Sequence, residues 1–149
     1  MLKFTFELDD ESVDSFSLGH LTVIGRYSTI SSRDEKRYVN VMMIFMAVGD
    51  LLDDIRRFLL DKNAEKYNFV GVDSSFQFYI NKKGSNLVLI DKAGKEVDKV
   101  NSEELVHAVW QGVNEFLSDY QHYLGPEEIV YGDLKLSTKE FKEAFSLDS

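Results

Sequence analysis

Two histidines follow an acidic residue by three positions, a spacing that can place two metal ligands one turn apart on a helix. The pairs are Glu104 with His107 and Asp119 with His122. Both fall on one predicted helix, where about 15 residues separate them by roughly 22 Å, so the pairs cannot share a metal ion. Because both pairs are expected to face solvent, we predict neither a metal site nor a bound cofactor.

Other sequence patterns that would identify an enzyme are missing. The chain contains no cysteine, which excludes disulfides, thiolate catalysis and cysteine-based zinc sites. Neither the G-x-S-x-G pattern of a nucleophilic serine nor a glycine-rich phosphate-binding pattern occurs. No catalytic residue is therefore predicted, and no small-molecule ligand is identified. The alternative is an enzyme of unknown reaction. It would require a Ser–His–Asp arrangement assembled by the fold, or a pocket lined by His20 or His107.

One segment of the chain, residues 101–133, is strongly acidic and has no compensating base. The whole chain carries 26 acidic and 17 basic residues, for a net charge of -9. The acids of this segment, which has no Lys or Arg, are Glu103, Glu104, Glu115, Asp119, Glu127, Glu128 and Asp133. Such a charge opposes binding to nucleic acid or to anionic membranes and favours a cationic protein as partner.

Most of this segment is predicted to form an amphipathic helix, which Asn101 or Ser102 caps and which Gly125 and Pro126 end. Helical spacing places the acids and histidines on one face, with Trp110 at the border. The opposite, apolar face is predicted to join the core. It consists of Leu105, Val106, Val109, Val113, Phe116, Leu117, Tyr120, Tyr123 and Leu124.

The acidic face and the residues after the helix are predicted to bind a cationic partner. Charge steers association, whereas aromatic side chains commonly anchor an interface, so Trp110 and Tyr131 are the candidate anchors. The predicted partner-binding residues are Glu104, Trp110, Glu115, Asp119, Glu127, Glu128, Tyr131 and Asp133. A solvated face that serves only solubility is an equally open interpretation.

Apolar periodicity predicts the elements of the first half of the chain. Alternation indicates a strand over Leu2–Leu8, and a second strand from Leu21 is expected to pair with it. The largely apolar segment Tyr38–Val48 suits a central strand, with a buried helix as the alternative. A helix is predicted over residues 51–62, with Asp50 in its first turn.

The second half of the chain completes an α+β fold. Four short strands are predicted between residues 67 and 100, joined in part by tight hairpins at Gly84 and Gly94. A short strand around Ile129–Tyr131 and a helix capped by Ser137 follow the acidic helix. We predict that residues 1–149 form one globular domain, with a largely antiparallel sheet of about six strands, two main helices and a short C-terminal helix.

The sequence predicts a cytoplasmic protein without a membrane partner. Its longest apolar run, Val41–Val48, is far short of the roughly 20 residues that span a bilayer. The start, "MLKFTFELDD", lacks the basic and apolar regions of a secretory signal.

The cysteine-free, acidic α+β chain, with its start "FELDDESVDSFSLGHLTVIGRYSTISSRD", resembles the small immunity proteins that bacteria pair with polymorphic or contact-dependent toxins. The resemblance implies tight binding to the C-terminal toxin domain of a larger secreted protein, commonly a basic nuclease. It also implies inhibition by covering the active site or the substrate path of that domain. No residue role is carried over from the resemblance. An acidic mimic of nucleic acid that occupies a DNA-binding protein is the alternative interpretation of the same carboxylates.

Overall fold

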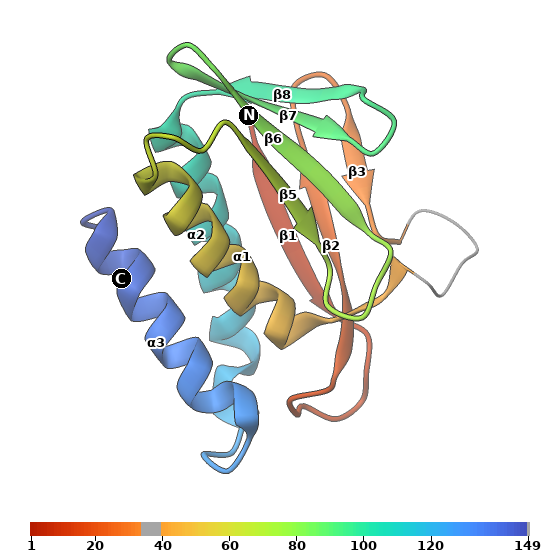
Figure 1. Cartoon of the computed structure of the whole chain (residues 1–149). Coiled ribbons are helices and arrows are strands. Elements are labelled where there is room, and N and C mark those ends of the chain that lie inside the picture. The colour runs from red at the N-terminus through yellow and green to blue at the C-terminus, as the bar shows by residue number, and fades with distance from the viewer. Residues whose placement is uncertain (34–39, 149) are drawn as a thin grey trace.

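The computed structural model describes residues 1–33 and 40–148 of the chain (Figure 1). In these residues, three α-helices accompany two antiparallel sheets of four strands each. The α+β class predicted from the sequence is therefore confirmed. The strands form two sheets, however, where a single sheet of about six strands was expected.

The first sheet is built around a long central strand. Its strands are β1 (Lys3–Leu8), β2 (Leu18–Ile24), β3 (Thr29–Ser31) and β4 (Met42–Met43). The predicted pairing of the first two strands is confirmed, with an antiparallel register that runs from Lys3 opposite Ile24 to Leu8 opposite Gly19. Strands β3 and β4 also pair with β2. The alternation in the sequence places Phe4 on the buried side of this sheet.

The second sheet is a meander in chain order and contains the four strands predicted between residues 67 and 100. Its strands are β5 (Lys66–Val70), β6 (Gln77–Lys83), β7 (Asn86–Asp91) and β8 (Glu96–Val100). Gly84 and Gly94 have φ angles of 63° and 89° in the turns that join β6 to β7 and β7 to β8. Only glycine adopts such angles at little cost, so the hairpin prediction is confirmed at both positions.

The two sheets meet where the β2–β3 turn contacts β8. The Val97 carbonyl accepts a hydrogen bond from the Tyr27 amide at 3.0 Å. A Cβ at Gly25 would collide with the same carbonyl group, so only glycine permits this close approach. Below the junction, the rings of Phe4 and Phe78 pack edge to face with centroids 6.2 Å apart. These contacts between distant parts of the chain join the two sheets around one shared core.

Helix α1 (Ile44–Leu60) begins earlier than predicted. Of the predicted strand Tyr38–Val48, only Met42–Met43 is a strand, Ile44–Val48 opens α1, and Tyr38 and Val39 lie outside the described residues. The buried helix considered as an alternative is thus correct for residues 44–48. Because the start of α1 is almost entirely buried, its residues are apolar all round and show no helical period. Asp50 consequently lies in the second turn of the helix and not in the first.

Helix α3 (Ile129–Ala144) replaces the predicted strand at Ile129–Tyr131 and the predicted helix start at Ser137. Ser137 is buried in the middle of the helix, where its small side chain faces Gly49 of α1. The C-terminal helix therefore has 16 residues and is not short. Its buried residues, at positions 130, 134, 137 and 141, follow helical spacing but include a serine, which weakened the apolar signal in the sequence.

Helix α2 (Ser102–Tyr120) confirms the predicted acidic helix and its cap. Asn101 accepts a hydrogen bond from the Glu104 amide at 2.8 Å, and Glu104 accepts one from the Asn101 amide at 3.1 Å. Helix α2 ends before the predicted end at Gly125 and Pro126, and the 3-10 helix η2 (Gln121–Tyr123) follows it. Tyr123, predicted for the core face, is consequently 64% exposed.

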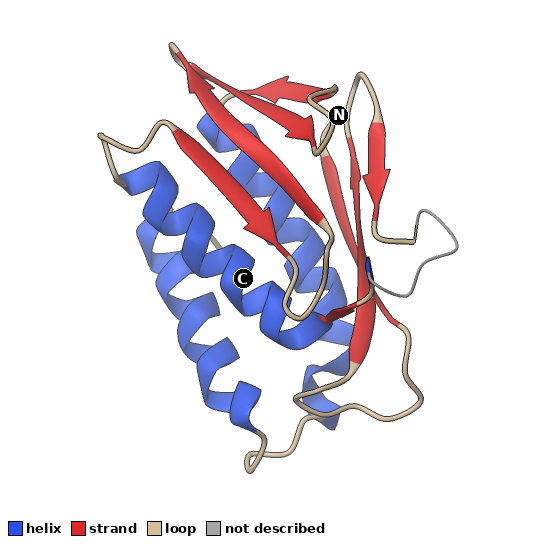
Figure 2. Cartoon of the chain, turned by 45° about the vertical axis from the view of Figure 1, so that its right-hand side comes forward, coloured by secondary structure: helices blue, strands red, loops and turns tan. Residues whose placement is uncertain are grey.

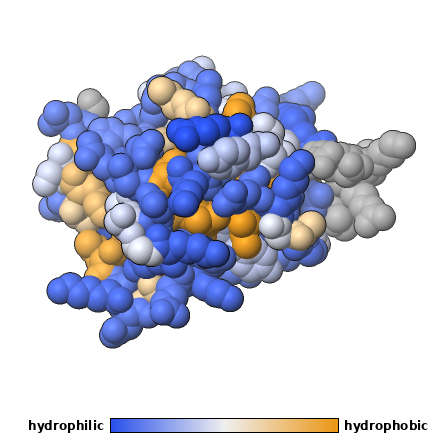
Figure 3. All heavy atoms as spheres, turned by 90° about the horizontal axis from the view of Figure 1, so that it is seen from above, coloured by the Kyte–Doolittle hydropathy of each residue, from blue (hydrophilic) through white to orange (hydrophobic). Residues whose placement is uncertain are grey.

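The helices lie on one side of the molecule and the strands on the other (Figure 2). Helix α1 contacts both sheets and both other helices, so it is the centre of the packing. Helix α2 packs on β1. On the end of the molecule shown in Figure 3, hydrophobic atoms appear in separate small groups among hydrophilic ones, which is usual for protein surfaces. No helix in the described part of the chain has the length and apolar content needed to cross a membrane.

Candidate protein-binding surface

The predicted acidic face of α2 is present on the folded protein. Glu104, Glu115 and Asp119 are exposed on the side of α2 that points away from the core, and we call these three residues the α2 acidic surface. Glu104 also closes the capping box. A carboxylate oxygen of Glu115 accepts a hydrogen bond from the side-chain amide nitrogen of Gln111 at 3.4 Å. Within residues 1–33 and 40–148, none of the three carboxylates forms an ion pair.

Trp110, one of the two predicted anchors, belongs mostly to the core. Its side chain stacks on Phe141 of α3 with ring centroids 5.9 Å apart, and the residue is 9% exposed. The indole nitrogen donates a hydrogen bond to the Asp148 carbonyl at 3.2 Å. The indole therefore joins α2 to α3 and to the C-terminal residues, and it offers a partner little surface in this conformation.

Tyr131 and Asp133 lie on opposite sides of α3. Tyr131 lines a shallow depression next to η2, and the ammonium group of Lys135 lies 4.6 Å from the centre of its ring. Asp133 lines a groove between α3 and α1. Glu127 is exposed in the turn before α3. The structure thus separates Asp133 from Tyr131, although the sequence places the two residues only two positions apart.

Glu128 has an internal role that sequence reasoning missed. One carboxylate oxygen accepts hydrogen bonds from the Ser15 amide at 2.8 Å and from the Ser15 hydroxyl at 2.7 Å. The Ser15 hydroxyl in turn accepts a bond from the Val130 amide at 3.3 Å, in the first turn of α3. This network fastens the loop between β1 and β2 to the start of α3. No local pattern could reveal it, because its members lie more than 100 positions apart.

Replacing Glu128 with alanine is expected to lower the free energy of unfolding by about 1–2 kcal/mol, because the buried Ser15 loses its charged acceptor. Urea denaturation of purified protein measures the change. Alanine at the exposed neighbour Glu127 is the matched control and should leave the stability within about 0.5 kcal/mol of the wild type. Equal stability of the two variants would contradict the structural role of Glu128.

Basic residues from α3 lie beside α2, although the acidic segment itself has none. Lys139 and Lys142 line a shallow depression of about 350 Å³ together with Asn114 and Ser118 of α2. The depression is on the flank of α2 next to α3, whereas Glu115 and Asp119 are not among the residues that line it. The acidic character predicted from the sequence therefore holds for the outward side of α2 but not for the side next to α3.

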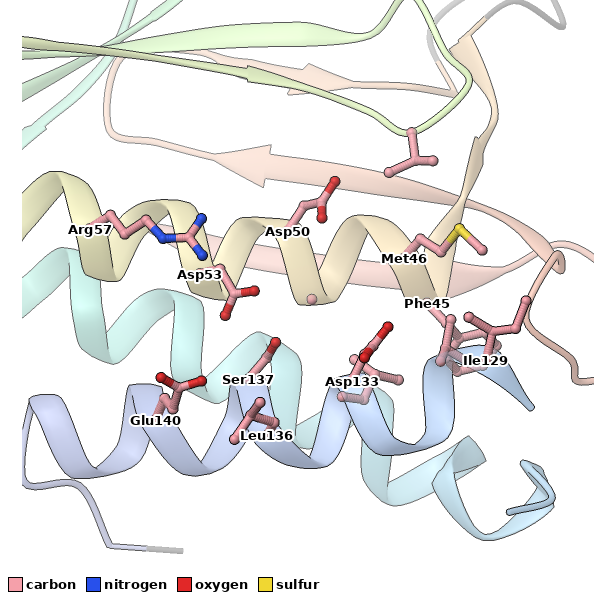
Figure 4. A pocket seen from close by; sticks show the side chains of 14 residues that line it. Phe45, Met46, Asp50, Asp53, Arg57, Ile129, Asp133, Leu136, Ser137 and Glu140 are labelled. Atoms are coloured by element: carbon pink, nitrogen blue, oxygen red, sulfur yellow. The ribbon is translucent and has the colours of Figure 1, made fainter. Parts of the chain in front are cut away.

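A groove of about 490 Å³ runs between α1 and α3. Its apolar residues include Phe45 and Met46 of α1 and Leu134 of α3. Figure 4 shows Asp53 on α1 directed toward α3, and Asp133 and Glu140 on α3 directed toward α1. The charged residues that line the groove are Asp50, Asp53, Arg57, Asp133 and Glu140. The groove therefore combines an apolar floor with a surplus of carboxylates.

Arg56 neutralises one half of this groove. Its guanidinium lies 3.7 Å from a carboxylate oxygen of Asp53 and 3.7 Å from one of Glu140, so it bridges α1 and α3. In the described residues, Asp50 and Asp133 form no ion pair. Arg57, which also lines the groove, is the base whose charge acts on Asp50.

The environment of Asp50 and Asp54 on α1 raises the pKa of both carboxyl groups. Partial removal of water by the groove walls raises the pKa of Asp50, and repulsion from Asp54 and Asp53 raises it further, while Arg57 opposes the shift. Burial likewise raises the pKa of Asp54, although a hydrogen bond from the Tyr67 hydroxyl at 3.0 Å and the charge of Arg57 act in the opposite direction. Burial and the neighbouring Asp54 raise the pKa of the Tyr67 hydroxyl far above its usual value.

Replacing Asp50 with asparagine is expected to stabilise the protein by a few tenths of a kcal/mol at pH 7, a small effect because solvent screens the carboxylate. The pKa of Asp50 is higher in the folded protein than its usual 3.8, so the folded protein binds this proton more tightly than the unfolded chain does. The charged form therefore destabilises the fold above the folded pKa. The advantage of Asp50→Asn should shrink as the pH falls through the raised pKa and should vanish below the unfolded value.

Urea denaturation of both proteins across this pH range measures the difference. Asp119→Asn, which removes one exposed charge from α2, is the control for the change in net charge. An advantage of Asp50→Asn that grows on acidification would contradict the proposed electrostatics.

His20 forms a Ser–His–Asp arrangement, which the sequence had left open. Its Nδ1 lies 2.9 Å from the Ser32 hydroxyl, and its Nε2 lies 3.5 Å from a carboxylate oxygen of Asp9. Ser32 is buried, and its hydroxyl accepts a hydrogen bond from the Leu21 amide at 2.9 Å. A nucleophilic serine must reach a substrate, so the arrangement in this conformation fastens β2 to the residue after β3 and does not resemble a catalytic site.

The other two histidines are exposed on or next to α2. His107 lines a depression of about 530 Å³ between α2 and the C-terminal residues, together with Glu103 and Trp110. The ring of His122 lies against that of Tyr123, with centroids 4.1 Å apart. Among the described residues, no group of three or more His, Asp or Glu side chains is arranged to hold a metal ion.

Comparison of the chain with protein-family models, with curated proteins and with solved structures finds no match.

Proposed function

We propose that this protein binds a cationic protein through the α2 acidic surface. We further propose that the partner is a bacterial toxin domain with basic nuclease character, which this immunity protein neutralises in the cytoplasm. The observation that carries the proposal is the combination of exposure and charge on α2, where Glu104, Glu115 and Asp119 form no ion pair within the described chain. Such carboxylates raise the rate of encounter with a basic protein and repel acidic ones.

The position of these residues supports a role for α2 in recognition. The capping box and the packing of α2 on β1 hold the helix in place, so its carboxylates need little reorganisation to bind. Glu127 extends the acidic region beyond the end of α2. Exposed aromatic surface is available at Tyr123, which the early end of α2 leaves outside the core. Tyr123 is thus a better placed anchor than the largely buried Trp110.

The proposal is tested with the protein encoded by the neighbouring gene. Its C-terminal domain is mixed with this protein, and the complex is measured by calorimetry and by the remaining activity of the domain. We expect a one-to-one complex with a nanomolar dissociation constant, loss of toxin activity, and an association rate that falls as salt is added. No complex at micromolar concentrations, or a complex that leaves the activity of the domain intact, would contradict the immunity function.

A further inference from the structure

The residues that follow α3 help to cover the indole of Trp110. The indole nitrogen donates a hydrogen bond to the Asp148 carbonyl at 3.2 Å. Phe145 and Leu147 line the depression of about 530 Å³ beside Trp110, and both pack against the core. We call residues 145–148 the strap. Together with Phe141 of α3, which stacks on the indole, the strap keeps Trp110 almost fully buried.

The strap leaves α3 through a strained bend. The Leu147 amide donates a hydrogen bond to the Lys142 carbonyl at 2.9 Å, the Ser146 amide donates one to the Glu143 carbonyl at 3.4 Å, and Ser146 has a φ of 52°. This pattern is the Schellman ending of a helix, in which the left-handed residue is usually glycine because a Cβ is disfavoured there. The serine at position 146 therefore strains the closed strap, and opening of the bend relieves the strain.

The packing that opposes this strain is modest. Phe145 and Leu147 are each only partly buried, and Ser146 and Asp148 are exposed. The buried residues of α3, at positions 130, 134, 137 and 141, all precede the strap, and α3 packs chiefly on α1. The strap can therefore leave α2 while α3 stays in place. Segments with few buried apolar contacts open at a lower free energy than the core does.

We propose that the strap opens as a unit in the folded protein and uncovers Trp110, while the helices and the core keep their packing. The conformation described above is the closed form. Opening exchanges the hydrogen bond between Trp110 and Asp148 for hydrogen bonds to water, and it exposes the indole on the flank of α2 beside His107. An uncovered indole is the kind of aromatic anchor that the closed form withholds from a partner. The opening is a property of the free protein and does not depend on the proposed function.

Hydrogen exchange of the indole N–H tests the opening in the free protein. Trp110 is the only tryptophan of the chain, so NMR identifies its indole resonance directly. We expect the protection of this group to be at least about 100-fold lower than that of the Val109 amide, which lies in the buried part of α2. Low concentrations of urea should leave the indole protection unchanged, because local opening exposes little surface, and should reduce that of the Val109 amide.

Two variants of the strap should change the indole exchange in opposite directions. Ser146→Gly relieves the strain of the bend and should slow the exchange about fivefold. Leu147→Ala removes packing that closes the strap and should accelerate it about tenfold. Leu136→Ala, at a side chain of α3 that is 56% exposed, is the control and should change it by less than about twofold.

Three results would overturn the opening of the strap. The first is an indole N–H with the same protection and urea dependence as the Val109 amide, because Trp110 would then be uncovered only when the core unfolds. The second is an indole N–H without protection, since the strap would then not cover Trp110. The third is an exchange rate that either Ser146→Gly or Leu147→Ala leaves unchanged. The proposed function is tested separately, with the toxin domain.

Discussion

Replacing Glu115 and Asp119 together with lysine is expected to weaken binding of the cognate toxin domain by about 100-fold or more, which corresponds to about 2.7 kcal/mol. Both carboxylates are exposed on the outward side of α2 and form no ion pair with the described residues. Their replacement therefore breaks no internal contact of that kind. Reversing the charge replaces attraction by repulsion at two adjacent turns of the helix, so the association rate should fall as well.

The matched control carries the same change in charge elsewhere on the protein. Glu65→Lys with Glu96→Lys alters two exposed acids next to the second sheet, at β5 and β8. This variant should bind the toxin domain within about threefold of the wild type, apart from a weak effect of net charge. If the acidic face of α2 serves only solubility, both variants should bind the toxin domain equally well. Calorimetry on the two variants and the wild type distinguishes these outcomes.

Replacing Gly112 with alanine is expected to lower the free energy of unfolding by about 2–3 kcal/mol, although alanine is the better helix former by about 1 kcal/mol. Gly112 lies in α2 against β1, where a Cβ would collide with the carbonyl oxygen of Phe4. The helix would have to move away from the strand. Because the Phe4 side chain is fully buried, that movement would disturb the centre of the core.

The same substitution at Gly132 provides the control. Gly132 lies in α3, and a Cβ there would meet no atom within 4 Å in the described residues. Gly132→Ala should therefore stabilise the protein by about 0.5–1 kcal/mol. Urea denaturation of the two variants gives opposite signs if α2 and β1 pack as described. Stabilisation by both substitutions would show that the close contact between Gly112 and Phe4 does not exist.

The strands and caps could be predicted because their signals are local. Alternation marked β1, the glycines at 84 and 94 marked two hairpins, and Asn101 with Glu104 marked the start of α2. Each of these features is determined by residues that lie a few positions apart in the sequence. The arrangement in two sheets was missed because it depends on which strands pair, and the pattern of a single segment does not contain that information.

Two helices were misplaced for opposite reasons. The start of α1 is buried on nearly every side, so Ile44–Val48 is continuously apolar and a helix cannot be told from a strand by period alone. In α3, the exposed Ile129 and Leu136 and the buried Ser137 blur the apolar face. Helix α3 is defined chiefly by its packing on α1, which the pattern of a single segment does not contain.

The candidate site was predicted in part. Periodicity placed Glu115 and Asp119 correctly on the exposed side of α2. The groove was missed, since it needs α1 and α3 to lie side by side. Its sequence signals were Asp50 and Asp53 near the start of the helix predicted over residues 51–62 and the seven-residue spacing of Asp133 and Glu140. That spacing has meaning only once both residues are known to lie on a helix.

Carboxylate footprinting of the complex tests the central claim most directly. Exposed Asp and Glu side chains are labelled with an amine through carbodiimide chemistry, and the labelling is compared with and without the toxin domain. We expect Glu115 and Asp119 to lose most of their labelling in the complex, while Glu65 and Glu96 keep theirs. Undiminished labelling of Glu115 and Asp119 in a saturated complex, with protection elsewhere, would contradict the α2 acidic surface as the binding site.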